Sequence, residues 1–226
     1  MLPQRIIGDI DLNGLTSTDG LILPELIIGD LGLNGLTSVV GLTLPRVVRN
    51  IDLNGLKSGA DLAGLILPKE YTTIYLDGLK EADGIIFPRS FVWICLNGLT
   101  SAEGLTLPEI VEALYLNGLT SPAGLDLPKN IHYDLYLNGL TSAEGLTLPK
   151  IVGEIHLSSL PESEKEILRQ RHPEFAHKIT LSLSGPKNFA LSIYEPQNRT
   201  ESTRPDCVRK EESLRREDYP LRALNR

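Results

Sequence analysis

The sequence is poor in cysteine and in aromatic residues, and each shortage excludes a class of protein. Its 226 residues include two cysteines, Cys95 and Cys207, which are too few for a disulfide framework or a zinc site on their own. This scarcity favours a reducing compartment. Aromatic residues make up 5% of the chain, with a single Trp. Aliphatic side chains must therefore fill the core.

Long apolar runs and excess positive charge are absent as well. No apolar segment approaches the ~20 residues that cross a membrane, and the first residues, Met-Leu-Pro-Gln-Arg, lack the basic and apolar stretches of a secretory signal. The formal net charge of −7 argues against nucleic acid as a partner. We therefore expect a cytoplasmic protein with no membrane span and no nucleic-acid partner.

What the sequence does have is an internal repeat. The tetrapeptide Leu-Asn-Gly-Leu begins at Leu12, Leu33, Leu53, Leu96, Leu116 and Leu137, and variants of it begin at Leu76 and Leu157. Successive starts lie 20 to 23 residues apart, which gives eight units. One unit has a single apolar stripe and cannot close a core alone, so the units are expected to stack as coils of a solenoid.

Each unit predicts one short strand followed by a turn. Two positions before the first leucine of every unit stands Ile or Leu, and this alternation places both side chains on one face of a strand. The position five before the first leucine is also apolar in most units: Ile7, Ile28, Val48, Tyr71, Phe91, Val111, His132 and Val152. We interpret the histidine at 132 as a sign that the register of this unit is shifted, rather than as a catalytic residue. The Asn-Gly pair is expected to turn the chain through a positive φ at glycine.

Asn-Gly between apolar residues is also typical of a β-hairpin. The residues that follow the turn disfavour this alternative. Segments such as Thr-Ser-Ala-Glu-Gly (141–145) are too polar and too rich in glycine to form a partner strand. Parallel pairing between successive units is therefore preferred over an antiparallel meander.

The pattern apolar-x-x-Leu-x-Leu, with a later Leu-Pro as in Leu107-Pro108, resembles the short-period bacterial leucine-rich-repeat family over about residues 1–160. The resemblance implies a stack of about eight coils with a parallel β-sheet. Some bacterial relatives are delivered into host cells, so delivery to a host cell, by a route not visible in the sequence, is the alternative to a cytoplasmic location. The family usually places Asn or Cys three residues after the second strand leucine. This chain has Leu there (Leu15 and its equivalents), and its Asn residues fall two positions earlier. The family's internal Asn ladder is therefore expected to be missing, and a regular β-solenoid remains the alternative architecture.

The sequence divides into a solenoid (1–160), a C-terminal helix-strand cap (161–194) and a charged tail (195–226) that is expected to be disordered. Ser159-x-x-Glu162 resembles a capping box at the start of a helix that runs to about Arg171. Ile167 and Leu168 are expected to face the last coil, and Pro173 to end the helix. Residues 179–183 alternate like an edge strand.

Candidate binding residues lie one and three positions before the first leucine of each unit, because these positions alternate with the core. The early units place carboxylates there, whereas later units place the only Trp and three Tyr. Aromatic rings beside carboxylates are typical of protein-recognition surfaces. The predicted contact residues are Asp52, Tyr75, Trp93, Tyr115, Asp134, Tyr136 and His156.

The sequence predicts no enzyme, cofactor or metal site. It contains no Gly-x-Ser-x-Gly and no His-Glu-x-x-His. The predicted function is a monomeric, non-enzymatic scaffold that binds another protein. Two alternatives stay open: a structural or ice-binding solenoid, suggested by the threonine column that includes Thr100, Thr120 and Thr141, and a carbohydrate-active β-helix enzyme.

Overall fold

A computed structural model of the chain describes residues 3–68, 72–151 and 153–179. The chain divides into two compact units, Met1–Ser182 and Leu183–Arg226, and every described residue belongs to the first. The predicted tail, Cys207 and most of the predicted strand 179–183 lie outside the described residues.

The described chain is built from short strands joined by loops. The strands are β1 (Arg5–Ile7), β2 (Ile10–Asp11), β3 (Leu26–Ile28), β4 (Asp30–Gly32), β5 (Asn50–Asp52), β6 (Thr73–Tyr75), β7 (Ser90–Cys95), β8 (Ile110–Tyr115), β9 (Asn130–Ile131), β10 (Leu135–Tyr136), β11 (Lys150–Ile151) and β12 (Ile155–His156). The helices are α1 (Glu162–Arg171) and the 3₁₀ helices η1 (Gly59–Leu62) and η2 (Pro173–Phe175).

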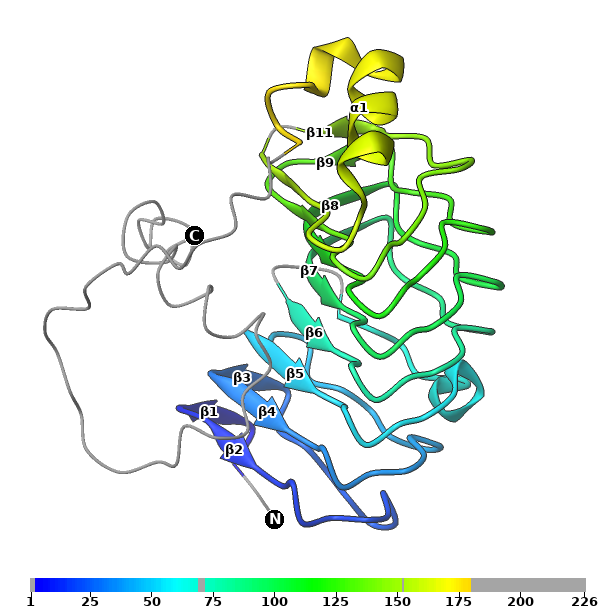
Figure 1. Ribbon diagram of the computed structural model, residues 1–226. Coiled ribbons are helices and arrows are strands. Elements are labelled where there is room, and N and C mark those ends of the chain that lie inside the picture. The colour runs from blue at the N-terminus through cyan, green and yellow to red at the C-terminus, as the bar shows by residue number, and fades with distance from the viewer. Residues whose placement is uncertain (1–2, 69–71, 152, 180–226) are drawn as a thin grey trace, which may run out of the picture. The chain divides into compact units, whose positions relative to one another are not determined.

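All pairings between these strands are parallel, so the structure is a repeat solenoid and the hairpin alternative is wrong. The predicted aliphatic column lies in register along one sheet, and Figure 1 shows its strands following one another up the stack. The column consists of Ile10, Leu31, Ile51, Ile74, Ile94, Leu114, Leu135 and Ile155.

The core is a set of aliphatic columns that run the length of the stack. In the middle coils the sheet residue Ile94 and both leucines of the repeat, Leu96 and Leu99, have no exposed surface. A leucine buried to this extent stabilises the fold by about 1.5–3 kcal/mol. In the first coil Leu12 and Leu15 are only partly buried, because one of their sides lacks the neighbouring coil that covers later leucines.

The apolar position five before the first leucine is not a buried column in every unit, since Ile7, Ile28 and His132 are exposed. Ile7 is 76% exposed and Ile28 is 38% exposed, and Val111 pairs with Ile131 rather than with His132. The units around Ile28 and His132 are 21 residues long, so each accommodates one extra residue after its buried isoleucine, Ile27 or Ile131. His132 is thus displaced by a register adjustment, as predicted. Tyr71 and Val152 lie outside the described residues.

A ladder of Asn and Asp side chains connects the coils, at a position two residues before the one that the leucine-rich-repeat family uses. It occupies the residue directly after the first leucine of each unit. Each side-chain oxygen accepts the backbone N–H of the equivalent residue in the next coil at 2.7–3.2 Å. The ladder runs through Asn13, Asn34, Asn54, Asp77, Asn97, Asn117, Asn138 and ends at Ser158. The ladder satisfies a backbone donor at every turn.

The glycine of each Asn-Gly pair is required for a different reason from the one predicted. Apart from Gly8, the glycines with positive φ precede the Leu-Pro or Phe-Pro segment of a unit, as at Gly104 and Gly145, whereas Gly98 and its equivalents do not adopt positive φ. A Cβ atom on Gly98 would collide with the backbone oxygen of Asp77 in the preceding coil. These glycines therefore permit close stacking of successive coils.

The helix α1 covers the last coil, as the sequence predicts, but its start and its buried face differ from the prediction. Its N-cap is Pro161, which makes no side-chain capping bond, and Ser159 instead donates its N–H to the Asn138 carbonyl. Leu168 is fully buried, whereas Ile167 is 40% exposed and Lys165 is buried in its place. Since residues 165 and 168 are three apart, they lie on the same face of the helix.

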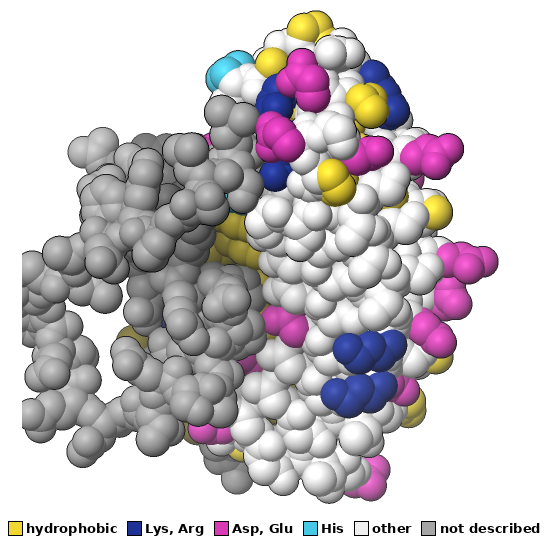
Figure 2. All heavy atoms as spheres, in the orientation of Figure 1, with side chains coloured by type: hydrophobic (Ala, Val, Ile, Leu, Met, Phe, Trp, Pro, Cys, Tyr) yellow, Lys and Arg dark blue, Asp and Glu magenta, His cyan; other side chains and the backbone are white. Residues whose placement is uncertain are grey.

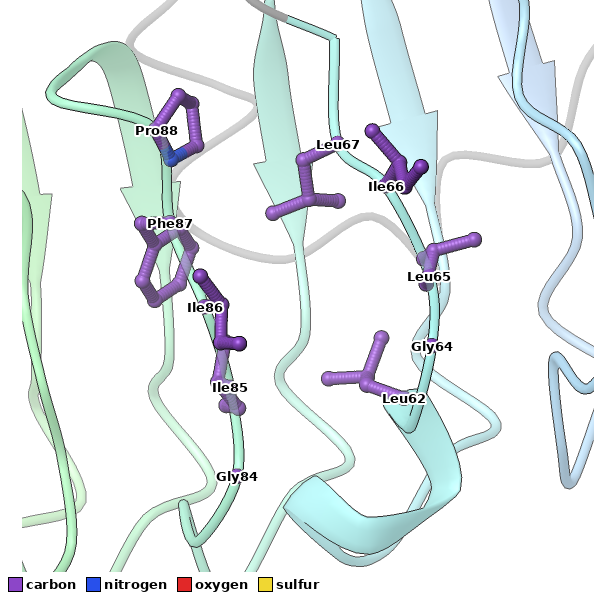
Figure 3. A pocket seen from close by; sticks show the side chains of 10 residues that line it. All are labelled: Leu62, Gly64, Leu65, Ile66, Leu67, Gly84, Ile85, Ile86, Phe87 and Pro88. Atoms are coloured by element: carbon purple, nitrogen blue, oxygen red, sulfur yellow. The ribbon is translucent and has the colours of Figure 1, made fainter.

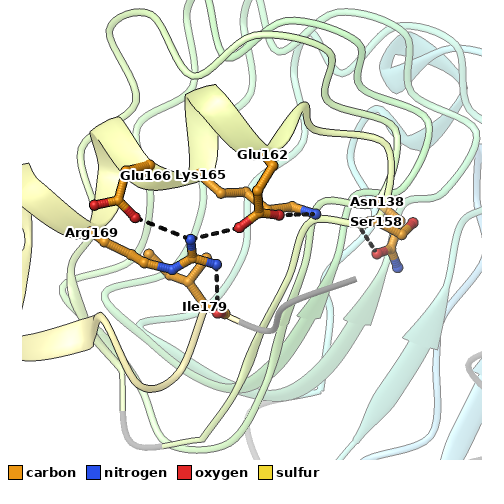
Figure 4. Close-up of polar contacts among 7 residues, drawn as sticks. All are labelled: Asn138, Ser158, Glu162, Lys165, Glu166, Arg169 and Ile179. Carbon is orange, nitrogen blue, oxygen red and sulfur yellow. Dashed lines mark hydrogen bonds and ion pairs between the residues drawn. The ribbon is translucent and has the colours of Figure 1, made fainter. Parts of the chain in front are cut away.

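Ion pairs within α1 order the helix, and a hydrogen bond joins it to the last coil (Figure 4 shows the ion pairs). Glu162 accepts from Arg169 at 2.7 Å and lies 3.8 Å from the buried Lys165 Nζ. Glu164 accepts the Ala143 backbone N–H at 3.0 Å. The helix therefore takes the place of a further coil: Glu164 accepts a backbone N–H of the last coil, and Leu168 covers the end of the core.

Candidate functional site

The predicted contact residues lie on the sheet face, defined here as the residues one and three positions before the first leucine of each unit. These side chains alternate with the buried aliphatic column and do not belong to the hydrophobic core cluster. Their register is regular: Tyr75, Cys95, Tyr115, Tyr136 and His156 follow one another in successive strands. The strand periodicity of the sequence therefore predicts the sheet face correctly.

Three of these rings form a continuous stack. The Tyr115 and Tyr136 rings are 4.2 Å apart and inclined by 5°, and the Tyr136 and His156 rings are 4.2 Å apart and inclined by 3°. Trp93, from the neighbouring column, lies with its ring centroid 6.4 Å from that of Tyr115. Parallel in-register strands place equivalent side chains about 4.8 Å apart, which suits ring stacking. We call Trp93, Tyr115, Tyr136 and His156 the aromatic column.

The rings are well buried, although they lie on the face of the sheet opposite the aliphatic core. Tyr75 is 2% exposed, Tyr115 3%, and Trp93 and Tyr136 are each 6% exposed. Stacking on both sides covers the two faces of the Tyr136 ring. The more accessible predicted residues are Asp52, Asp134 and His156, which are half-buried.

Asp134 is held at the end of the aromatic column by three groups. Its Oδ1 accepts the Glu154 N–H at 2.9 Å, its Oδ2 accepts the Tyr136 hydroxyl at 3.0 Å, and the His156 Nε2 lies 3.6 Å from Oδ2. Burial opposes ionisation, but the His156 imidazole, the Glu154 N–H and the Tyr136 hydroxyl outweigh it and lower the pKa of Asp134 to about 2. Asp134 is therefore a carboxylate at neutral pH.

The same contacts affect the neighbouring rings. Burial and the negative charge of Asp134 raise the pKa of the Tyr136 hydroxyl, so it stays protonated and donates to Asp134. The Nε2 atom of His156 is buried and has no hydrogen-bond partner among the described residues. Glu154 Oε2 lies 3.9 Å from it, and the Glu154 side chain is 61% exposed.

The first coils carry a second acidic cluster on the sheet face. Arg49 binds Asp30 at 2.8 Å through its Nε and lies 3.5 Å from Asp9. Its hydrogen bond to Asp30 is opposed by burial but raises the pKa of the guanidinium. The strand periodicity does not find Arg49, because Arg49 lies four positions before Leu53, outside the two columns. Arg49 could have been identified from the sequence only by its proximity to Asn50 and Asp52, which belong to the two columns.

The predicted residues thus fall into two groups. Trp93, Tyr115, Tyr136, His156 and Asp134 come together at the C-terminal end of the sheet face. Tyr75 lies one strand before Trp93, and Asp52 pairs with Tyr75 one strand further away.

An apolar groove that the sequence does not predict lies on the loop side of the stack (Figure 3). It measures about 330 Å³ and lies between the coils of η1 and β6, and Ile66 and Ile86, each 81% exposed, flank it. The unit that contains Ile66 is 23 residues long, and this irregularity was the available signal. The described residues that line the groove are all Leu, Ile, Phe, Pro or Gly.

Within the described residues, no group of three or more His, Cys, Asp or Glu is arranged to hold a metal ion. The same residues contain no helix with the length and apolar character that a membrane crossing requires. Comparison of the chain with protein-family models, with curated proteins and with solved structures gives no match.

Proposed function

We propose that the chain is a non-enzymatic scaffold that binds another protein through its sheet face. The observation that carries this proposal is the aromatic column with Asp134 at its end. These side chains are ordered by stacking and hydrogen bonds, yet they lie outside the aliphatic core that holds the solenoid together. Bacterial leucine-rich-repeat proteins, which the repeat resembles, are the family we propose for the chain.

Rigidity supports the proposal. Binding normally costs about 0.5–1.5 kcal/mol for each flexible side chain that becomes fixed. In the aromatic column this ordering has already taken place, since Tyr136 is stacked on both sides and hydrogen-bonded to Asp134. Because the rings are 6% exposed or less, the partner is expected to meet the half-buried Asp134 and His156, with the rings as a fixed base beneath them.

The ice-binding alternative has one observation in its favour. Thr100, Thr120 and Thr141 are exposed in successive coils, and the Thr141 hydroxyl donates to the Thr120 carbonyl at 3.1 Å. Lys57 and Lys80, both exposed, interrupt the same column. A long charged side chain spoils a flat surface, so we favour protein binding. Thermal hysteresis of the purified chain would support the alternative.

The test is affinity capture with the intact chain, followed by a measurement of the dissociation constant for the captured protein. A double substitution, Trp93→Ala with Tyr115→Ala, removes part of the stacked base beneath Tyr136, Asp134 and His156. It is expected to weaken binding about tenfold, since side chains that are no longer held in place cost about 0.5–1.5 kcal/mol each to order on binding. The melting temperature of the variant shows whether it is folded. Thr100→Ala with Thr120→Ala is the matched control on the loop side. A folded aromatic variant that binds like the wild type would contradict the proposal.

A further inference from the structure

The two ends of the sheet face contain the same arrangement of carboxylates. At the N-terminal end, Asp9 Oδ1 accepts the backbone N–H of Asp30 in the next coil at 2.9 Å. At the C-terminal end, Asp134 Oδ1 accepts the backbone N–H of Glu154 in the next coil, also at 2.9 Å. All four residues lie three positions before the first leucine of their units. In each pair, two carboxylates of successive coils therefore stand side by side on one column.

The residue before the second carboxylate is glycine at both ends of the sheet face. Gly29 precedes Asp30 and Gly153 precedes Glu154. A Cβ atom on Gly29 would collide with the Gly8 carbonyl and come within 2.8 Å of Asp9 Oδ1, and one on Gly153 would collide with the Tyr133 carbonyl and with Asp134 Oδ1. Glycine at this position therefore leaves room for the carboxylate of the preceding coil in both places.

The two ends differ in the cation that they hold. At the N-terminal end, the Arg49 guanidinium of the following coil reaches both acids, with distances of 2.8 Å to Asp30 and 3.5 Å to Asp9. At the C-terminal end, the described residues provide no Lys or Arg within ion-pair distance of Asp134 or Glu154. Among the residues that the structure describes, only His156 approaches them, at 3.6 and 3.9 Å, and its Nε2 has no hydrogen-bond partner there.

The position equivalent to Arg49 is occupied by His177. Arg49 lies two residues before Ile51 of the aliphatic column, and His177 lies two residues before Ile179, which bridges Ile155 in parallel. His177 is exposed and makes no ion pair with Asp134 or Glu154, both of which are described. An imidazole side chain thus takes the register position that a guanidinium side chain takes at the N-terminal end.

We infer that Asp134 and Glu154 bind a guanidinium of the partner protein, in the way that Asp9 and Asp30 bind Arg49. This inference rests on the proposed function, since it names the chemistry of the partner at the same face. The Glu154 side chain is 61% exposed and reachable, and Asp134 is fixed by Tyr136. The His156 imidazole, which stacks on the Tyr136 ring, lies beside both acids.

The probe is a fluorescein-labelled tetra-arginine peptide, and its binding to the full chain is followed by fluorescence anisotropy at low salt. Glu154→Gln removes one carboxylate and is expected to weaken binding about fivefold, as for a partly exposed charge-assisted bond. Glu144→Gln is the matched control, because Glu144 is an exposed turn residue on the loop side. It is expected to change the dissociation constant less than twofold.

A second substitution tests the equivalence of positions 177 and 49 by supplying a guanidinium from the chain itself. His177→Arg is expected to place a guanidinium on Asp134 and Glu154 and to weaken peptide binding by about fivefold. Thr147→Arg adds the same charge at an exposed position on the loop side and is expected to have less than a twofold effect. Glu154→Gln combined with His177→Arg should weaken binding little beyond either change alone, because both act on one site.

Three results would overturn the inference: no binding by the wild type, equal effects of Glu154→Gln and Glu144→Gln, or unchanged binding by His177→Arg. The outcome is distinguishable from that of the proposed function. If the peptide behaves as expected but the captured protein ignores the aromatic substitutions, the cation site stands and the proposed function fails. If the captured protein depends on the aromatic column but the peptide does not bind, the inference fails alone.

Discussion

Asn97 and Asn117, twenty residues apart in sequence, are joined by two hydrogen bonds. Oδ1 of Asn97 accepts the backbone N–H of Asn117 at 3.2 Å and its side-chain N–H at 2.8 Å. This is one step of a ladder in which every coil uses a side-chain oxygen to satisfy a backbone donor of the next. The ladder ends at Ser158, whose side chain carries no amide or carboxylate oxygen to continue it.

Asn97→Ala is expected to lower the free energy of unfolding by about 1–3 kcal/mol, because it leaves the half-buried N–H of Asn117 without its acceptor. Asn97→Asp keeps an oxygen in place, as Asp77 does naturally in the same ladder, and is expected to cost less than about 1 kcal/mol. Urea unfolding of the two variants measures the difference. Equal losses would show that the ladder bond contributes little.

The two kinds of glycine should respond differently to alanine. Gly98→Ala places a Cβ atom against the Asp77 carbonyl and should lower stability by about 3 kcal/mol, the upper range for overpacking. Gly145→Ala meets no atom within 4 Å but retains a φ of 76°, which should cost about 1–2 kcal/mol. Thermal melting of both variants tests this order, and a reversed order would refute the explanation by close stacking of coils.

The low pKa of Asp134 predicts an acid-dependent contribution to stability. Because its folded pKa is about 2, below the ordinary 3.8, its contribution is fully present above pH 3.8 and is lost as the pH falls towards 2. Since Asp134 is partly exposed, we expect about 1 kcal/mol. The stability difference between wild type and Asp134→Asn, measured by urea unfolding, should therefore be larger at pH 7 than at pH 2.5. A difference that does not change with pH would contradict this prediction.

The cap offers a matched pair of substitutions on α1. Leu168→Ala removes a fully buried side chain and should lower the free energy of unfolding by about 2–5 kcal/mol. Ile167→Ala removes one that is 40% exposed and should cost less than about 1 kcal/mol. Calorimetry on both variants makes the comparison. Similar losses would mean that the helix does not cover the core through Leu168.

The repeat period and its aliphatic columns were sufficient to predict the parallel solenoid and the capping helix. The register adjustment at His132 was predicted, but the exposure of Ile28 was not, because an extra residue in a 21-residue unit is accommodated locally beside the strand. The role of the Asn-Gly glycines was also missed. Their conformation depends on the distance between coils, which one unit considered alone does not reveal.

The sequence also predicted only part of the candidate site. Alternation within a strand identifies Trp93, Tyr115 and Tyr136 as residues of the sheet face, and the in-register pairing brings them together. It does not reveal that Asp134 bonds to the next coil, or that Arg49 bridges two acids from outside the columns. Both depend on side-chain contacts between coils, which the period of the repeat does not specify.

The most direct test of the account is a pair of charge reversals measured against the captured protein. Glu154→Lys reverses a charge on the sheet face beside Asp134. Glu144→Lys makes the same change at an exposed turn on the loop side, where Figure 2 shows further acidic side chains. The account predicts that the first raises the dissociation constant at least tenfold, which corresponds to about 1.4 kcal/mol, and that the second changes it less than twofold. Equal effects of the two substitutions, or no effect of either, would contradict binding through the sheet face.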